Sequence, residues 1–429
     1  MSRNLRPNAS WTCCFPCPCP PRPRGSCAHR KITERRLPLA RLTIDTEYLT
    51  GRLERLLGIA SPTGYTDEVV WEVCRELGRL GVDYELTRRG AIRARIPGEE
   101  PRPARAVVAH VDTLGAQVKA VKDNGRLEVV PIGHWSSRFA EGARGTVFSE
   151  KGGWRGTILP LKASGHTFNE EVDEQPVSWR QVEMRIDARV RNRHDVLKLG
   201  IDVGDIIGID PQPEFLDNGF IVSRHLDDKA GVAVMLAAMK AIMEDAQTPT
   251  VDTYWLFTIA EEVGSGASSV LVPDVASMIT VDNGTTAPGQ NSDEFGVTIA
   301  MADQTGPFDF HLTRKLVKLA REEDIRFQKD VFRYYRSDSA SALEAGADIR
   351  TALVTFGVDA SHGYERIHVH ALRSLAELLT AYVLSPVEIE RDASPMAGVE
   401  GFTHQDQSEA HEKAAADKPA PERDGSRPR

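Results

Sequence analysis

The order of apolar and polar residues predicts alternating helices and strands from Asp45 onward. Segments whose apolar residues recur every three or four positions indicate helices, and short apolar runs bounded by turn residues indicate strands. Helices are expected at residues 48–57, 69–80, 229–244, 312–322 and 372–383. Strands are expected at residues 84–87, 91–96, 104–109, 254–260, 278–281 and 350–357. This alternation is typical of an α/β domain.

One block of the chain departs from this order. Residues 119–214 are rich in glycine and in short β-prone pieces such as GTVFSE, WRGTILPL and VEMRIDARV, and they carry few helix signals. We therefore predict an inserted all-β domain that divides the α/β domain into residues 44–118 and 215–386. Because the insert adds surface without adding any of the candidate ligands described below, we expect it to mediate assembly into a homo-oligomer.

The two ends of the chain differ from the middle in composition. Residues 387–429 are polar and predict a disordered tail. Residues 1–43 hold five of the six cysteines, and Cys14-x-x-Cys17 resembles half a zinc site, but no second pair accompanies it. We interpret this segment as a disordered extension or a misplaced start, since it has no continuous apolar core of a secretory signal. With Cys74 alone in the body, a reducing cytoplasm is expected.

The composition and net charge of the chain indicate which classes of binding partner are expected. The 429 residues are 41% apolar and 27% charged, which is typical of a soluble protein of two or more domains, and nothing in the sequence suggests a membrane span. The net charge is −9, and the body shows no stripe of Lys and Arg. General nucleic-acid binding is therefore not expected, and small molecules or peptides are the expected partners.

Acidic and histidine residues follow several of the predicted strands. His110, the pair Glu261-Glu262 and Asp282 each come directly after an apolar run. In an open α/β sheet, ligands gather beyond the carboxyl ends of the strands, so these side chains are expected to converge. Asp227 directly precedes a predicted helix, where an aspartate is also a common N-cap. Taken together, the residues predict a hydrolase site that holds two metal ions.

A two-metal site needs one carboxylate that bridges both ions and further nitrogen or oxygen ligands for each. We assign the bridge to Asp227, with His110 and Asp282 on one ion and Glu262 and His362 on the other. The donor set of imidazole and carboxylate admits Zn, Co or Mn.

Two further residues complete the predicted chemistry. Glu261 is left free to act as general base, taking a proton from water and passing it to a leaving amine. Asp112 is placed to orient the His110 imidazole. Adjacent glutamates in extended backbone diverge, so Glu261 and Glu262 are not expected to flank a glycosidic bond.

The motifs AHVDTLG, LDDKAG, TIAEEVGSGA and TVDNG occur in this order and spacing. They resemble those of the glutamyl-aminopeptidase or tetrahedral-aminopeptidase family of co-catalytic metallopeptidases, over about residues 45–385, with IGHW and LGIDVGD as landmarks within the insert. The resemblance implies a phosphorylase/aminopeptidase-like three-layer α/β domain, a β-barrel insert used in assembly, two divalent ions, a cis peptide bond after Asp227, and release of amino-terminal residues from short peptides or aminoacyl amides. An N-acyl amino-acid deacylase or carboxypeptidase on the same dinuclear core is the alternative.

The chain departs from the family pattern in two places. Thr113 stands where many relatives carry an acidic residue, and the last motif reads SHGYERIH. His368 and His370 are therefore rivals of His362 for the last ligand. The closing pattern, together with QTGPFDFHLTRK, resembles a bacterial subgroup linked to gene clusters for a glutamine-dipeptide osmoprotectant.

The loop RYYRSDSAS supplies candidate substrate-binding residues. Asp338 is expected either to hold the free α-amine of a peptide, which a buried carboxylate does well, or to support the site. Arg333 and Arg336 suit carboxylates and amide oxygens. A preference for Glu or Gln over Leu as the first residue follows, unless both arginines pair with surface acids.

Overall fold

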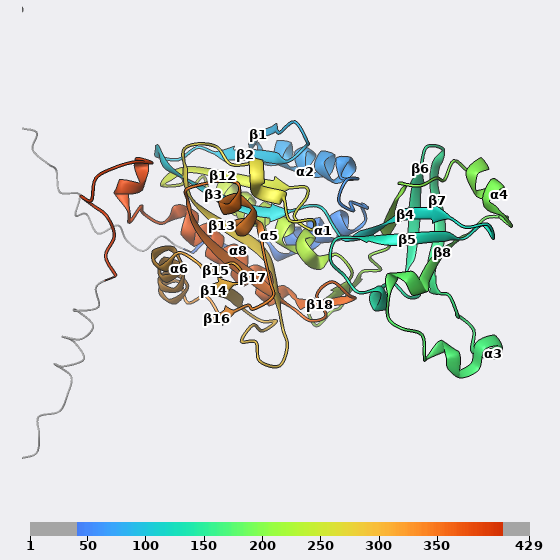
Figure 1. Ribbon diagram of the computed structural model, residues 1–429. Helices are drawn as coiled ribbons and strands as arrows, with labels where there is room; N and C mark the ends of the chain where they lie inside the picture. Colours follow the sequence, from blue (N-terminus) through green and yellow to red (C-terminus); the bar gives the residue numbers. More distant parts are fainter. Residues whose placement is uncertain (1–40, 406–429) are drawn as a thin grey trace, which may run out of the picture. The chain divides into compact units, whose positions relative to one another are not determined.

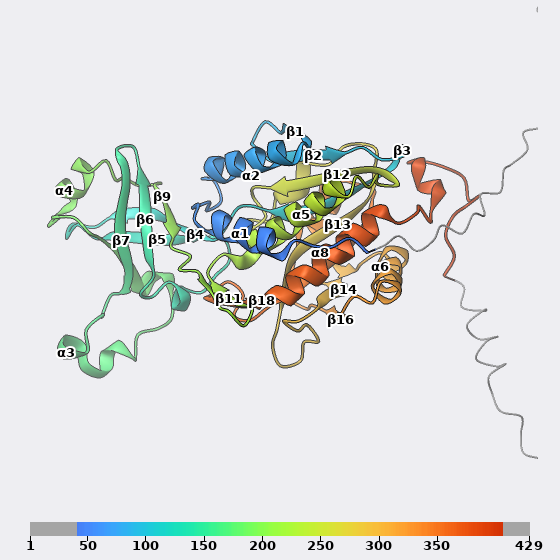
Figure 2. The same ribbon diagram turned by 180° about the vertical axis from the view of Figure 1, so that it is seen from behind.

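The computed structural model describes residues 41–405, and Figures 1 and 2 show it from opposite sides. Within these residues, one sheet is built from β1 (Asp83–Leu86), β2 (Ile92–Ile96), β3 (Glu100–His110), β12 (Val251–Thr258), β13 (Val275–Thr285), β14 (Val297–Asp303), β15 (Gly306–Pro307), β16 (Phe327–Val331) and β17 (Arg350–Val358). The strand order is β1-β2-β12-β3-β13-β17-β14-β15, with β16 paired to β14. Strands β12, β3, β13 and β17 are parallel, so their carboxyl ends meet at one edge.

Helices cover both faces of this sheet. One face packs against α1 (Thr46–Leu57), α2 (Asp67–Leu80), α5 (Leu226–Glu244), α6 (Phe310–Glu322) and α8 (Val369–Leu384), and the other against α7 (Asp338–Glu344) and η4 (Gly266–Ser269). Figure 2 shows α1, α5 and α8 in front of the sheet. Successive residues of β3 alternate between the two cores, with Val107 on one side and Val108 on the other. Burial on both faces explains why this strand reads as a continuous apolar run.

The inserted block forms a closed barrel in the order β4-β5-β8-β7-β6-β9. Its strands are β4 (Gly115–Val121), β5 (Leu127–Ile132), β6 (Arg144–Ser149), β7 (Gly152–Pro160), β8 (Val182–Ile186) and β9 (Ile206–Ile209). Their inward residues form a core separate from that of the sheet. Gly156 shows why glycine recurs here, because a Cβ at this position would lie 2.6 Å from the Arg185 carbonyl oxygen. The predicted fold class, an α/β domain with an inserted all-β barrel, is confirmed.

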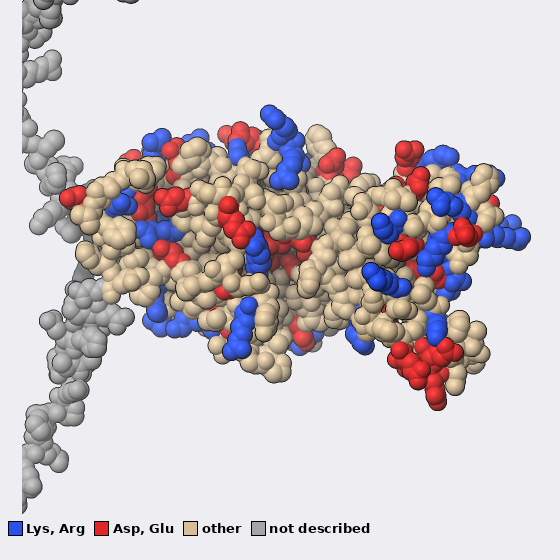
Figure 3. Space-filling model, viewed as in Figure 1, with Lys and Arg blue, Asp and Glu red and all other residues tan. Residues whose placement is uncertain are grey.

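Short elements connect the barrel strands and flank the barrel. They are η1 (Ser137–Phe139), α3 (Gly165–Phe168), η2 (Asn169–Val172), η3 (Trp179–Gln181) and α4 (Arg193–Lys198). Figure 3 shows a patch of acidic side chains near α3, where η2 carries Glu170 and Glu171. On the rest of this face the described Lys and Arg residues are interspersed with Asp and Glu. The face therefore lacks the basic stripe that nucleic-acid contact requires.

A small three-stranded sheet joins the segment that follows the barrel to a strand near the last helix, α8. Strand β11 (Phe220–Ser223) pairs with β10 (Glu214–Phe215) and with β18 (Glu365–His368). The tail predicted at residues 387–429 contains a short helix, η5 (Glu390–Ala393). This helix is attached to the sheet domain by the Arg350–Asp392 ion pair. The predicted amino-terminal extension falls largely outside the described residues, as do its cysteines. Among residues 41–405, no helix has the length and apolar composition that crossing a bilayer requires.

Candidate metal centre

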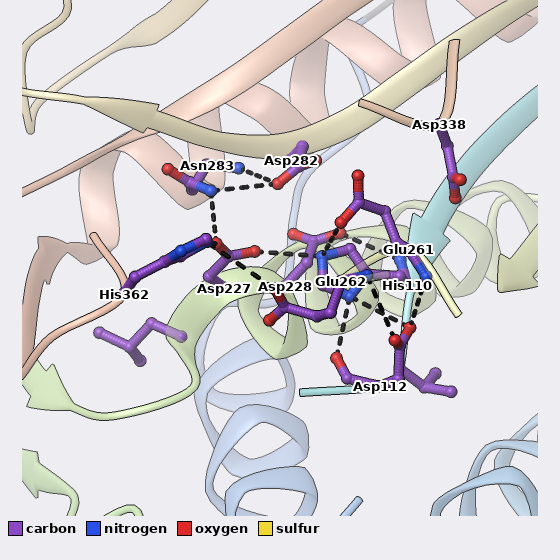
Figure 4. Close-up of polar contacts among 12 residues, drawn as sticks. His110, Asp112, Asp227, Asp228, Glu261, Glu262, Asp282, Asn283, Asp338 and His362 are labelled. Atoms are coloured by element: carbon purple, nitrogen blue, oxygen red, sulfur yellow. Dashed lines mark hydrogen bonds and ion pairs between the residues drawn. The ribbon is translucent and has the colours of Figure 1, made fainter. Parts of the chain in front are cut away.

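The predicted ligands meet at the carboxyl edge of the parallel strands (Figure 4). His110 is the last residue of β3, Glu262 follows the end of β12, and Asp282 lies near the end of β13. Asp227 lies at the start of α5, and His362 lies in the loop between β17 and β18. Residues up to 252 positions apart in the sequence, His110 and His362, are thereby brought to one place. The convergence expected from the strand ends is present.

The His110 imidazole is fixed in one orientation and one tautomer. Its Nδ1 lies 2.9 Å from the carbonyl oxygen of Asp112. Because a carbonyl can only accept, Nδ1 carries the proton, and the lone pair of Nε2 faces the site. That Nε2 lies 3.1 Å from Oδ1 of Asp227. The ring is thus prepared to offer Nε2 to a metal ion.

The His362 ring is oriented in the same way by a residue of the insert. Its Nδ1 donates to the carbonyl oxygen of His134 at 2.7 Å. His134 belongs to IGHW, one of the landmarks of the sequence resemblance. The other ring nitrogen, Nε2, lies 3.2 Å from Oδ2 of Asp227 and 3.8 Å from Oε2 of Glu262.

His368, the rival candidate, lies elsewhere. Its Nε2 donates to the carbonyl oxygen of Asn218 at 3.0 Å, and its Nδ1 accepts from the amide of His370 at 3.1 Å. Both ring nitrogens are therefore already used within the fold. Of the three candidate histidines, His362 is the one beside Asp227 and Glu262.

Asp227 lies between the two histidines, with one carboxylate oxygen toward each ring. Its Oδ2 also accepts a hydrogen bond of 2.6 Å from the side-chain amide of Asn283. The peptide bond between Asp227 and Asp228 is cis, as the sequence resemblance implied. This position supports the predicted bridge rather than a helix cap, because the N-cap residue of α5 is His225, and the side chain of His225 makes no capping bond.

Two residues were missed in the assignment of roles from the sequence. Asp228 is fully buried, and its Oδ2 accepts from the amide of His110 at 3.2 Å, while its Oδ1 has no partner. A Cβ at Gly231 would lie 2.1 Å from that Oδ1, so glycine keeps the space free. Asn283 bridges Asp282 and Asp227 through its side-chain amide. Both residues stand in motifs that the sequence analysis quoted, LDDKAG and TVDNG. The sequence does not show which atoms their side chains contact.

The possible ligand atoms form two groups, each with all its atoms within 4.8 Å of one another. We call His110, Asp228 and Asp282 the inner group, and Asp227, Glu262 and His362 the outer group. Buried oxygens of Asp228 and Glu262 lack any hydrogen-bond partner. Orphaned carboxylate oxygens beside imidazole nitrogens fit divalent metal ions well.

The charge balance of the site points the same way. Burial is the main cause that raises the pKa of Asp282 to about 7, and it raises the pKa of Glu262 well above its ordinary value. Burial opposes protonation of His362, but the Asp227 and Glu262 carboxylates raise its pKa to about 11. So many buried carboxylates in contact need added positive charge to remain ionised, which metal ions supply.

The Glu261-Glu262 pair is held by Asp112. Its Oδ1 accepts from the amide of Glu261 at 3.1 Å, and its Oδ2 accepts from the amide of Glu262 at 3.3 Å and from the Thr63 hydroxyl at 2.7 Å. The Glu261 side chain is 15% exposed, whereas that of Glu262 is 3% exposed. Glu261 therefore has the more accessible carboxylate, and burial raises its pKa well above the ordinary value.

Asp338 and the two arginines occupy different environments. Asp338 is buried, and its oxygens accept from the Thr258 hydroxyl at 2.6 Å and the Ala267 amide at 2.7 Å. These bonds favour support of the site over capture of a substrate amine. Arg336 pairs with Glu344, and Arg333 lines a surface hollow of about 620 Å³.

Comparison with known proteins extends this picture. The family profile of the M42 glutamyl aminopeptidase matches residues 90–378. YhfE of Bacillus subtilis (strain 168), provisionally named an aminopeptidase, is 38% identical over 337 residues, which cover 78% of this chain and 97% of that protein.

Solved structures with the same fold include a TET aminopeptidase from a marine sediment archaeon of the Thaumarchaeota. It has a TM-score of 0.73 and 18% identity, covering 83% of this chain and 99% of that one. The TET1 peptidase of Pyrococcus horikoshii, which can assemble into a tetrahedron or a large octahedral shell, has a TM-score of 0.70 and 22% identity, covering 78% and 99%. The chain therefore belongs to the M42 glutamyl aminopeptidase family of metal-dependent peptidases, and it is a hydrolase of peptide bonds.

Proposed function

We propose that the protein is a two-metal aminopeptidase that removes the amino-terminal residue from short peptides. The observation that carries the proposal is the position of Asp227, whose two carboxylate oxygens each face one histidine Nε2. His110 and Asp282 would hold one ion, Glu262 and His362 would hold the other, and Asp227 would be shared between them. Asp228 belongs to the inner group, and its Oδ2 accepts from the backbone amide of His110.

The reaction needs activation of the scissile carbonyl and of a water molecule, and it needs transfer of a proton. When bound, the two cations polarise the scissile carbonyl and lower the pKa of a water molecule toward neutrality. Glu261 takes the proton of the attacking water and delivers it to the leaving amine. The Asp112 carboxylate keeps Glu261 in place by accepting a hydrogen bond from the backbone amide of Glu261. Burial raises the pKa of Glu261, which favours its return of the proton to the leaving amine.

A substrate screen with metal analysis tests this proposal. Purified protein is expected to contain divalent metal ions and to release the first residue of aminoacyl anilides, while N-acylated peptides stay intact because the free amine is lost. Cleavage of N-acylated substrates instead would support the deacylase alternative.

The first-residue preference provides a separate test. Arg336 is occupied by Glu344, so Arg333 is the proposed partner of an acidic or amide-bearing first side chain. Wild type is expected to show a higher kcat/KM on Glu- and Gln-anilides than on Leu-anilide, and Arg333→Ala is expected to reduce that ratio about tenfold, the value of one charge-assisted hydrogen bond. Arg326→Ala is the matched control, because Arg326 is an exposed arginine that pairs with Asp293. An unchanged ratio in Arg333→Ala removes the specificity claim alone.

His362→Ala is expected to lower metal content and activity together, because it removes one ligand of the outer group. His368→Ala is the control, since the His368 ring is already satisfied by Asn218 and the His370 amide. Metal stoichiometry of both variants, measured after gel filtration, separates the two histidines. The assignment is wrong if His368→Ala loses metal while His362→Ala retains it.

We also propose that the barrel mediates self-association. The barrel has its own closed core, and none of the proposed ligands belongs to it, although the His134 carbonyl accepts from the His362 ring. Its outer surface is therefore free for contacts between copies. Light scattering at micromolar concentration is expected to give a mass that is a multiple of 47.3 kDa. A monomer at this concentration contradicts the proposal.

A further inference from the structure

Glu365 connects the two backbone segments that carry the outer ligands. It is the first residue of β18 and is 2% exposed. Its Oε1 accepts from the amide of His362 at 2.9 Å. Its Oε2 accepts from the amides of Leu226 at 2.8 Å and Asp227 at 3.2 Å. One carboxylate therefore holds the amide of the bridging aspartate and the amide of the distal histidine.

Both segments have conformations that need such a restraint. His362 has a φ of +63°, and His225, which precedes Leu226, has a φ of +67°. Residues other than glycine adopt this left-handed region at a cost and keep it where the surrounding structure enforces it. The amides of Leu226 and Asp227 also belong to the first turn of α5, where backbone donors have no helical partner.

Glu365 itself is held by a regular element. Strand β18 pairs with β11, where Glu365 lies opposite Ser223, just before the segment that leads to Asp227. The strand pair thus fixes the carboxylate relative to one ligand segment, and the hydrogen bonds fix it relative to both. Glu365 therefore links Asp227 and His362 through their backbone amides.

We propose that Glu365 is a positioning residue that sets the affinity of the outer group for its metal ion. The inference rests on the proposed function, since it takes Asp227 and His362 as ligands. Residues that orient metal ligands without touching the ion typically change metal affinity by about 10- to 100-fold when they are replaced. The effect should be larger at the outer ion, because the bonds of Glu365 reach both Asp227 and His362 there, whereas Asp227 is the only ligand that Glu365 holds at the other ion.

Glu365→Gln is the decisive variant. Three N–H groups point at the two carboxylate oxygens, so an amide NH₂ at either position faces a donor. At least one of the three bonds is lost whichever way the amide is turned. Glu183→Gln is the matched control, because Glu183 is also 2% exposed but lies in the barrel, paired with Lys122 and Arg126.

The experiment is a titration of chelator-treated full-length protein with Co²⁺, followed by visible absorption and calorimetry. Wild type and Glu183→Gln are expected to bind two equivalents with the same affinities. In Glu365→Gln one of the two sites is expected to weaken by about 10- to 100-fold, and the other, which shares only Asp227 with it, is expected to weaken less. The melting temperature of the metal-free variants shows whether each is folded. If Glu365→Gln does not fold, Glu365→Asp, which is too short to reach both segments, is expected to show the same unequal weakening.

The outcomes separate this inference from the proposed function. Wild type that binds fewer than two equivalents of Co²⁺ overturns the two-metal proposal and the Glu365 role with it. If wild type binds two and His362→Ala loses one, the function stands. In that case, unchanged affinity at both sites in the folded Glu365 variant, or equal weakening of both, overturns the positioning role alone.

Discussion

Asp227→Asn is expected to leave the protein without tightly bound ions and without measurable turnover. The substitution removes the negative charge between the two proposed cation sites. It also replaces one oxygen by an NH₂ group, which points at the Nε2 of either His110 or His362, where a metal ion has to sit. Because the same side chain serves both groups, both ions are expected to be lost together.

Metal content after dialysis and kcat on an aminoacyl anilide measure this effect. Asp252→Asn is a suitable control, because Asp252 is also buried and pairs with Arg95, but it lies on β12 away from the site. The control is expected to lose stability and keep its ions. Full metal content in Asp227→Asn would falsify the bridging role.

The sequence predicted well the positions of the candidate ligands at or near the ends of strands. His110 and Asp282 follow apolar runs that are buried on both faces of the sheet, and such runs are readable without tertiary information. Parallel neighbours then bring their ends together, which is a general property of α/β sheets. The same argument placed Glu261 and Glu262, although β12 ends two residues earlier than expected, at Thr258.

The residues that orient those ligands were not predictable in the same way. Glu365 reaches across 138 positions to the amide of Asp227, and Asn283 reaches across 56 positions to its carboxylate. Such contacts depend on how loops meet, and no local spacing reports them. Strands β14 and β16 were also not predicted. Strand β16 has no buried apolar run, whereas β14 is mostly buried and its apolar run VTIAMA was overlooked.

For Asp338 and His362 the sequence predicted the possible roles but did not choose among them. The sequence proposed two roles for Asp338, and its hydrogen bonds to Thr258 and Ala267 favour the supporting one. Likewise, three histidines near the end of the chain were candidates for the last ligand, and orientation of the ring decides between them. A residue type gives the possible chemistry, whereas the hydrogen bonds at its other atoms determine which role is available.

Glu261→Gln is expected to lower kcat by about 10² to 10⁴, the usual contribution of a general base. The ion content should stay that of wild type, because Glu261 belongs to neither the inner nor the outer group. KM should change little, since the amide has nearly the shape of the carboxylate. Metal analysis and steady-state kinetics on the same preparation test both halves of this expectation.

The pH profile adds a test that a structural defect does not mimic. Burial raises the pKa of the Glu261 carboxyl group. The carboxylate that acts as base is therefore lost as the pH falls through that raised pKa. Wild-type activity is therefore expected to decline on the acid side, and the residual activity of Glu261→Gln should lack that decline, because its amide does not titrate in this range. Glu262→Gln is the matched comparison and is expected to lose the outer ion. If Glu261→Gln arrives without metal while Glu262→Gln keeps both ions, the roles of the two glutamates are exchanged.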